Sequence, residues 1–113
     1  MRVKDGVRMD PVHPEMYYVD GVVDAIRMDM FGDEGTCTSS LRPPTPGGSG
    51  LHPLGLARDY RTRGLTHAEQ RRFAARVREV LDDRFDVILE GPASEVPRYQ
   101  NRAPHLHVEL DVQ

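Results

Sequence analysis

The sequence has almost no cysteine, which bounds both the fold and the compartment in which the protein can work. Cys37 is the only cysteine among 113 residues, so an internal disulfide framework is excluded and a reducing compartment is favoured. Residues 1–5 lack the apolar stretch of a signal peptide. We therefore expect the protein to be made in the cytoplasm, and to reach any external substrate through lysis, a virion or a partner.

A charge excess, a long apolar run and internal repeats are missing as well. Lys and Arg number 15 against 18 Asp and Glu, a net charge of −3, so the composition argues against a nucleic-acid partner. No apolar run is long enough to predict a membrane span. The length fits a single domain over residues 1–113, with room for one modest core.

Hydrophobic periodicity predicts two helices and four strands. Apolar residues recur at helical spacing over about 14–31, and the capping box Thr66-x-x-Glu69 begins a second helix over about 67–83. Strands are expected at about 36–40, 54–61, 85–89 and 104–111, with loops at 41–50 and 91–103 and an extended arm at 1–12. This order indicates an α+β fold, a small, largely antiparallel sheet packed with two helices.

The segment 104–111 alternates polar and apolar residues without interruption, the pattern of a half-buried strand. His105, His107 and Glu109 then share one face of the sheet. Upstream, His52 and Asp59 offer another imidazole and another carboxylate, and a bend at 53–55 could turn both inward. Two histidines, one aspartate and an open position are typical of a catalytic zinc site. The alternative is that these are surface histidines on a proline-rich loop and an edge strand.

The spacing of these residues resembles a known family. His52-x-x-Gly55-x-Ala57-x-Asp59, with Ser49 before it and His105-x-His107 after it, is similar to peptidase family M15. That family contains zinc D-Ala-D-Ala carboxypeptidases and phage endolysins, and the Hedgehog signalling domain shares its fold. The likeness is to short phage or prophage members, which have strands like 86–90 and 105–109 here. One extra residue separates Ser49 from His52 relative to the family pattern.

The resemblance implies that His52, Asp59 and His107 bind one Zn²⁺. It also implies that Arg42 and Ser49 contact the substrate, Arg42 by holding a carboxylate. Many members have a glutamate base three residues before the last histidine, but Pro104 occupies that position here.

Two residues could replace the missing base, Glu90 at the end of the neighbouring strand and His105. The alternative for Glu90 is an exposed carboxylate at a strand end. Glu109 is expected to orient a metal-bound histidine by binding its other ring nitrogen.

The resulting expectation is a Hedgehog/DD-peptidase-like zinc peptidase that hydrolyses peptide bonds of peptidoglycan stem peptides. The bond could be D-Ala-D-Ala or of the L-Ala-D-Glu type. Because the chain has no tryptophan, little is available to stack on sugars, and recognition should favour the peptide over the glycan. One alternative is a phage virion or assembly protein that keeps the fold, has lost the chemistry and contacts other virion proteins. Another is a metal-dependent binding module that holds a D-amino-acid carboxylate without cleaving it.

Arginines crowd the middle of the chain, and we interpret them as a solvated surface paired with nearby acids. A second interpretation is attraction to anionic cell-wall polymers. The residues are Arg58, Arg61, Arg63, Arg71, Arg72, Arg76, Arg78 and Arg84.

Overall fold

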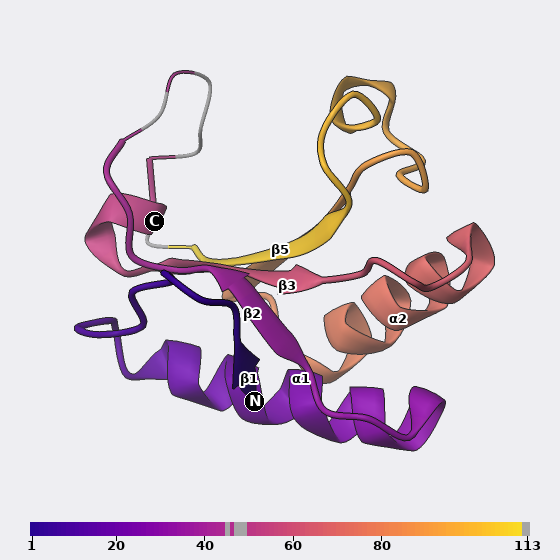
Figure 1. The fold of residues 1–113 in the computed structure, drawn as a ribbon, viewed down its shortest axis with the longest axis horizontal. Coiled ribbons are helices and arrows are strands. Elements are labelled where there is room, and N and C mark those ends of the chain that lie inside the picture. Colours follow the sequence, from indigo (N-terminus) through magenta and orange to yellow (C-terminus); the bar gives the residue numbers. More distant parts are fainter. Residues whose placement is uncertain (45, 47–49, 112–113) are drawn as a thin grey trace.

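The chain folds into two layers, a five-stranded sheet with two helices packed beneath it in the view of Figure 1. This computed structural model describes residues 1–44, 46 and 50–111. Within them the fold is α+β with a largely antiparallel sheet, as the sequence predicts. The elements are β1 (Arg2–Val3), α1 (Glu15–Phe31), β2 (Thr36–Ser39), η1 (His52–Leu54, a 3₁₀ turn), β3 (Ala57–Arg61), α2 (His67–Val80), β4 (Phe85–Glu90), η2 (Pro97–Tyr99, a second 3₁₀ turn) and β5 (His105–Leu110).

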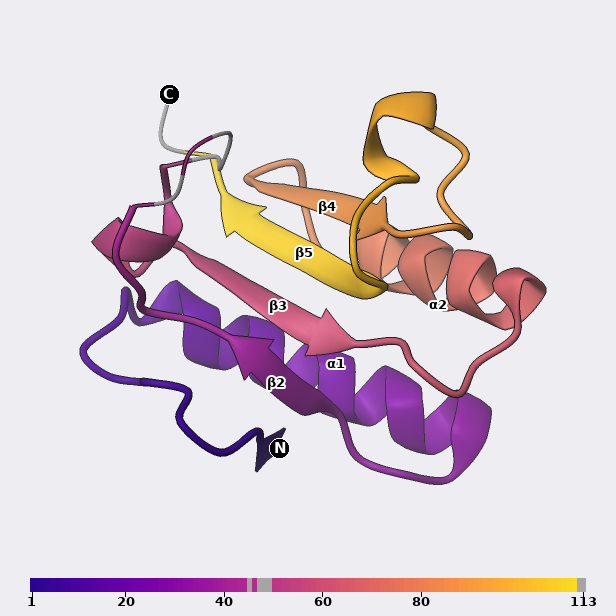
Figure 2. The ribbon, with the colours of Figure 1, turned by 45° about the horizontal axis from the view of Figure 1, so that its top comes forward.

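The sheet has the order β1-β2-β3-β5-β4, so the last strand in sequence lies between β3 and β4 (Figure 2). β1 pairs with β2 in parallel, and all other neighbours are antiparallel. β5 therefore has a partner on each side. Because directly paired residues point to the same face of a sheet, this register decides which side chains meet across three strands.

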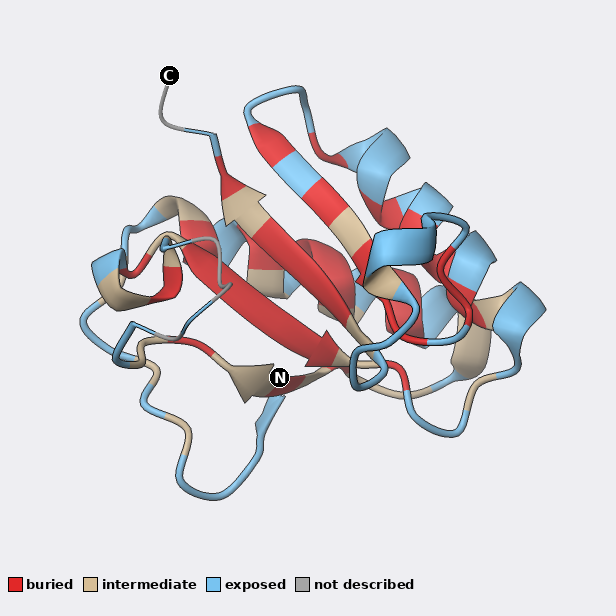
Figure 3. Ribbon diagram, turned by 90° about the horizontal axis from the view of Figure 1, so that it is seen from above, coloured by how far each residue is buried: buried red, intermediate tan, exposed pale blue. Residues whose placement is uncertain are grey.

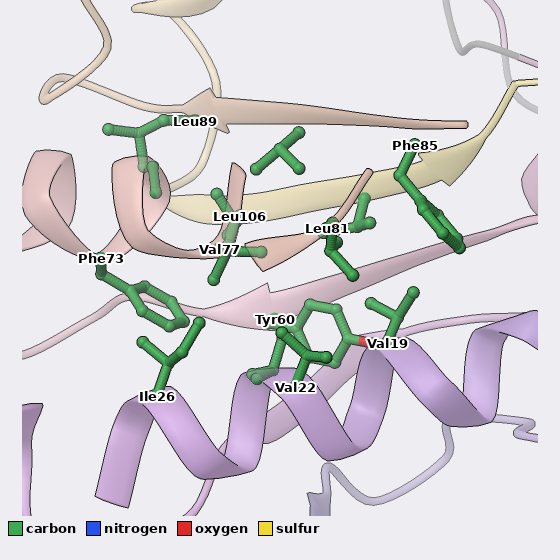
Figure 4. Close-up of a cluster of buried hydrophobic side chains, with 14 of the residues drawn as sticks. Val19, Val22, Ile26, Tyr60, Phe73, Val77, Leu81, Phe85, Leu89 and Leu106 are labelled. Carbon is green, nitrogen blue, oxygen red and sulfur yellow. The ribbon is translucent and has the colours of Figure 1, made fainter. Parts of the chain in front are cut away.

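The sheet face toward the helices carries the apolar core (Figure 4). Val19 of α1 and Phe73 and Val77 of α2 are fully buried against Tyr60 of β3 and Leu106 of β5. In Figure 3 buried residues follow β3 and β5, while the outer faces of the helices are exposed. Burying one large apolar side chain contributes about 1.5–3 kcal/mol, so this layer holds the sheet rigidly over the helices.

The ends of the helices follow local sequence signals. Thr66 Oγ1 accepts from the Glu69 backbone N–H at 3.1 Å, and Glu69 Oε1 accepts from the Thr66 N–H at 2.9 Å, which confirms the capping box. α1 ends where Gly32 adopts a left-handed conformation, with φ 74°. α2 ends at Val80, three residues before the predicted 83, because Leu81 is already extended. In the described residues neither helix is long and apolar enough to cross a membrane.

The prediction for the segment before β3 is wrong in detail. The strand expected over 54–61 begins only at Ala57, because 52–54 form a 3₁₀ turn that Gly55 ends at φ 69°. A Cβ on Gly55 would lie 3.0 Å from Val12 Cα, so glycine is needed there for the passing N-terminal segment. The start of that segment is extended, and residues 2–3 pair with β2 as strand β1.

The loop 91–103 rises above the sheet face that the helices leave uncovered (Figure 1). Its two ends meet at Gly91, whose φ is 106° and where a Cβ would lie 2.7 Å from Pro104 Cα. Only glycine allows this approach of backbone to backbone. The loop is thereby fixed directly beside the ends of β4 and β5.

Candidate metal centre

On the sheet face away from the helices, side chains lie in rows across β3, β5 and β4, and all of them except Ala57 and Ile88 are polar. The intervening residues, such as Tyr60 and Leu106, are buried on the core face, which confirms the alternation predicted for the last strand. Three such rows follow one another along the strands: Arg61–His105–Glu90, Asp59–His107–Ile88 and Ala57–Glu109–Asp86. We call the first of them the Arg61 row and the second the metal row.

His52, Asp59 and His107 converge on this face from η1, β3 and β5. Each offers one ligand atom, and these atoms lie within 4.8 Å of one another, close enough to hold a metal ion. All three residues are buried, with 3–5% of their surface exposed. The interpretation as surface histidines is therefore wrong, and β5 is an inner strand rather than an edge strand.

Local backbone geometry brings His52 and Asp59 together although they are seven residues apart in the sequence. The 3₁₀ turn places His52 above the sheet, and the turn at Gly55 returns the chain into β3. Asp59 Oδ1 then lies 3.4 Å from His52 Nε2 and 2.8 Å from His107 Nδ1. The two imidazole rings are 5.2 Å apart between centroids.

The outer nitrogen of each histidine is held by an oxygen. His52 Nδ1 lies 2.7 Å from the backbone oxygen of Ser40, and His107 Nε2 lies 2.7 Å from Glu109 Oε1. Such contacts fix the tautomer of a metal-binding histidine and leave its inner nitrogen free to coordinate. His52 Nε2 is indeed buried without a hydrogen bond among the described residues. Glu109 thus lies where the sequence predicts an orienting carboxylate.

Electrostatics holds a proton between Asp59 and His107 in the metal-free protein. Burial alone lowers the pKa of His107, but its hydrogen bonds to Asp59 and Glu109 outweigh this and raise the pKa to about 9. Burial raises the pKa of Asp59, yet its hydrogen bond with His107 and the nearby His52 imidazole hold that pKa well below its usual range. A metal ion must displace this proton, because it binds only the neutral imidazole.

The donor set fits a zinc ion. Two imidazole nitrogens and a carboxylate oxygen are its usual ligands, at about 2.0–2.2 Å from the metal in a tetrahedron, which places ligand atoms about 3.4 Å apart. The 3.4 Å between His52 Nε2 and Asp59 Oδ1 matches that spacing. The 2.8 Å between His107 Nδ1 and Asp59 Oδ1 is a hydrogen-bond distance, from which the pair would open by about half an ångström.

The two candidate bases lie together in the Arg61 row. His105 Nε2 is 3.5 Å from Glu90 Oε2 and 3.6 Å from Asp59 Oδ1, so it lies between Glu90 and the metal row. Arg102 Nη1 contacts the same Glu90 oxygen at 2.9 Å. Glu90 is 5% exposed, so its interpretation as an exposed carboxylate at a strand end is wrong. Burial raises the pKa of Glu90, but the contacts with His105 and Arg102 outweigh burial, so the pKa lies below its usual value. Glu90 is therefore ionised near neutral pH.

A buried ion-pair network supports the site from the core side of the sheet, and the sequence did not predict it. Arg58 is fully buried and points to the core face, where its Nε lies 3.2 Å from Asp20 Oδ1. Tyr60 donates its hydroxyl to the same oxygen at 2.7 Å, and Arg58 Nη1 donates to Ser40 Oγ at 2.8 Å. Ser40 in turn holds His52. The network therefore connects α1 to His52, and Arg58 is no solvated surface residue.

The residues expected to bind substrate are less well connected to the site. Ser49 lies outside the described residues. Arg42 is half-buried and lines a cavity of about 540 Å³ that no residue of the triad lines. The cavity is formed by Gly6, Arg8, Leu41, Arg42, Pro43 and Pro53.

Comparisons with protein-family models, curated proteins and solved structures gave no match for this chain.

Proposed function

We propose that this protein is a zinc-dependent peptidase that hydrolyses peptide bonds of peptidoglycan stem peptides. The observation that carries the proposal is the buried triad of His52, Asp59 and His107, with both histidines oriented through their outer nitrogens. A structural zinc site takes four protein ligands, whereas a catalytic site takes three and leaves one position open. Among the described residues, this site offers three.

A bound zinc ion would supply Lewis acidity, which polarises a carbonyl and makes water nucleophilic near neutral pH. The protein's own residues would provide the rest of the chemistry. Glu109 keeps His107 in one orientation, and the backbone oxygen of Ser40 does the same for His52. Fixed ligands need no reorganisation during a reaction, which is how a preorganised site accelerates it.

His105 is the residue placed to move a proton. Its Nε2 lies between Asp59 Oδ1 in the metal row and Glu90 Oε2, so it can take a proton on the metal side while Glu90 stabilises the charge. Arg102 holds Glu90 from the loop. This pair takes the place of the glutamate base that position 104 lacks, and acid–base catalysis of this kind contributes roughly 10²–10⁴-fold.

The substrate class rests on the resemblance of the sequence to zinc carboxypeptidases and phage endolysins, and the site is compatible with it. The D-Ala-D-Ala and L-Ala-D-Glu bonds are both candidates. Under this proposal the protein reaches the cell wall after lysis or as part of a virion.

The test is digestion of purified muropeptides by the zinc-loaded protein, with products separated by mass. We expect stem-peptide cleavage that EDTA abolishes and zinc restores. His107→Ala should lose both the metal, measured by elemental analysis, and the activity. His67→Ala is the matched control, because this exposed histidine at the start of α2 should leave both unchanged.

Two outcomes would contradict the proposal. A His107→Ala protein that keeps a full equivalent of zinc would refute the ligand set. Zinc binding without cleavage of any stem peptide would instead favour the virion or assembly protein that retains the site without its chemistry.

A further inference from the structure

Arg61 occupies a position beside the metal row that the other arginines of the chain do not share. It is the last residue of β3 and pairs with His105 of β5, so its side chain lies on the same sheet face as Asp59, two residues earlier. Two strand residues span about 6.8 Å, which places Arg61 one row from the triad. On this face Arg61 is paired with His105, which is itself paired with Glu90, and Asp59 and His107 form the next row.

Arg61 lacks the partner that an arginine in this setting usually has. It is half-buried, and among the described residues no hydrogen bond, ion pair or aromatic contact reaches its guanidinium. The nearby acids are already engaged: Glu90 by Arg102 and His105, and Asp59 by the histidines. The carboxylates of the Arg61 row and the metal row therefore leave the charge of Arg61 uncompensated.

The arginines nearest in sequence and space behave differently. Arg58 is fully buried and paired with Asp20 on the core face. Arg102 is held by Glu90 and stacked over Tyr99, with its guanidinium carbon 5.0 Å from the ring centroid. Arg63 is exposed beyond the end of the strand. Arg61 alone among these four combines a place on the site face with freedom to bind a ligand.

We propose that Arg61 binds a free carboxylate of the substrate, within two residues of the cleaved bond, and so makes the protein selective for acidic peptides. The geometry of an extended peptide supports this, since its residues advance about 3.4 Å each and would bring such a carboxylate from the triad to the Arg61 row. A planar guanidinium binds carboxylate through two parallel hydrogen bonds, and a half-buried position strengthens them. This inference rests on the proposed function and names the residue that selects the substrate.

Arg42 and Arg61 are then distinct sites. Arg42 lines the cavity beside η1, whereas Arg61 lies in the row that also contains both candidate bases. Arg61 becomes the residue that holds the carboxylate nearest the chemistry.

The experiment compares two soluble stem pentapeptides, one with free carboxylates and one with every carboxylate amidated. The zinc-loaded protein is tested with each, by kcat/KM where the peptide is cleaved and by Kd where it is not. We expect a preference of about 10-fold to 100-fold for the free acid, as expected for hydrogen bonds to a charged group. Arg61→Gln should abolish the preference through KM, and Arg61→Lys should restore part of it. Arg63→Gln is the control and should keep it.

The outcomes separate this inference from the proposed function. Equal use of both peptides, or binding of neither, would overturn the role of Arg61. A preference that survives in Arg61→Gln but disappears in Arg42→Gln would overturn it in favour of Arg42. A preference that depends on Arg61 without any cleavage would support the inference and refute the peptidase. Zinc content and melting temperature of each variant show that the fold is intact.

Discussion

Asp20 offers the sharpest test of how the fold supports the metal centre. Its carboxylate is the only anionic partner that the described residues give the fully buried Arg58, at 3.2 Å. Removing one partner of a buried ion pair costs about 3–5 kcal/mol, because the remaining charge is left uncompensated. The unfolding entropy of a 113-residue chain is about 0.24 kcal/mol per kelvin, so Asp20→Asn should lower the melting temperature by about 13–21 °C.

Asp29 on the same helix provides the matched control. It also pairs with an arginine, Arg76 at 3.1 Å, but its side chain is 67% exposed. Exposed pairs contribute under about 1 kcal/mol, so Asp29→Asn should shift the melting temperature by at most about 4 °C. Thermal melts followed by circular dichroism measure both variants. Equal shifts in the two variants would refute the view that Arg58 is buried and dependent on Asp20.

A double replacement separates stability from positioning. Burial raises the pKa of Asp20 more than Tyr60 and Arg58 lower it, so the pair is itself costly to bury. Replacing both charges by apolar side chains is often neutral or stabilising. The double variant Asp20→Leu with Arg58→Met should therefore recover most of the stability that Asp20→Asn loses. Its zinc affinity should nevertheless be lower than that of the unaltered protein, because Ser40 loses its contact with Arg58. Full zinc affinity in the double variant would show that Arg58 does not position the ligand through Ser40.

Two further predictions concern the metal-free site and the orientation of His107. The pKa of His107 is raised to about 9 from an unfolded value near 6.5, so its contribution to the stability of the metal-free protein, about 3 kcal/mol, is fully present below pH 6.5 and lost as the pH rises through 9. Melts between pH 6 and 9.5 should show this fall with EDTA and a smaller one with zinc, and parallel curves would contradict it. Glu109→Gln should weaken zinc binding by roughly 10–100-fold in a chelator competition, since the outer nitrogen of His107 loses its carboxylate. Asp86→Asn in the same row is the control, and an equal loss there would point to general charge rather than orientation.

Much of the fold follows from local signals in the sequence. The alternation of 104–111 correctly predicts which side chains of β5 face the core, because side-chain direction in a strand depends only on position. The capping box at Thr66 and Glu69 correctly predicts where α2 begins. His52 and Asp59 could be grouped with His107 because the residues between them allow a bend, although the bend proved to be a 3₁₀ turn.

The remaining features depend on contacts between distant strands, which local patterns do not contain. Nothing in the sequence of β5 indicates that it inserts between β3 and β4, and this insertion is what brings Glu90 to His105. Asp20 does carry a signal, since it is an acid beside the buried Val19 of α1. Its partner Arg58 could not be told from the surface arginines, because a stretch rich in arginine predicts a solvated surface, and only the side-chain alternation of β3 places Arg58 on the core face.

The alternation of side chains along β3 explains how this strand contributes both to the ion-pair network with α1 and to the metal site. Its residues alternate between the core, where Arg58 and Tyr60 bind Asp20 of α1, and the opposite face, where Asp59 and Arg61 lie. A shift of one residue against β5 would exchange the two sets, burying Asp59 and Arg61 in the core while exposing Arg58. The ion pair with Asp20 penalises that shift, because only the observed register gives the buried arginine a counter-charge. The core-facing charges thus specify the register on which the metal row and the Arg61 row both depend.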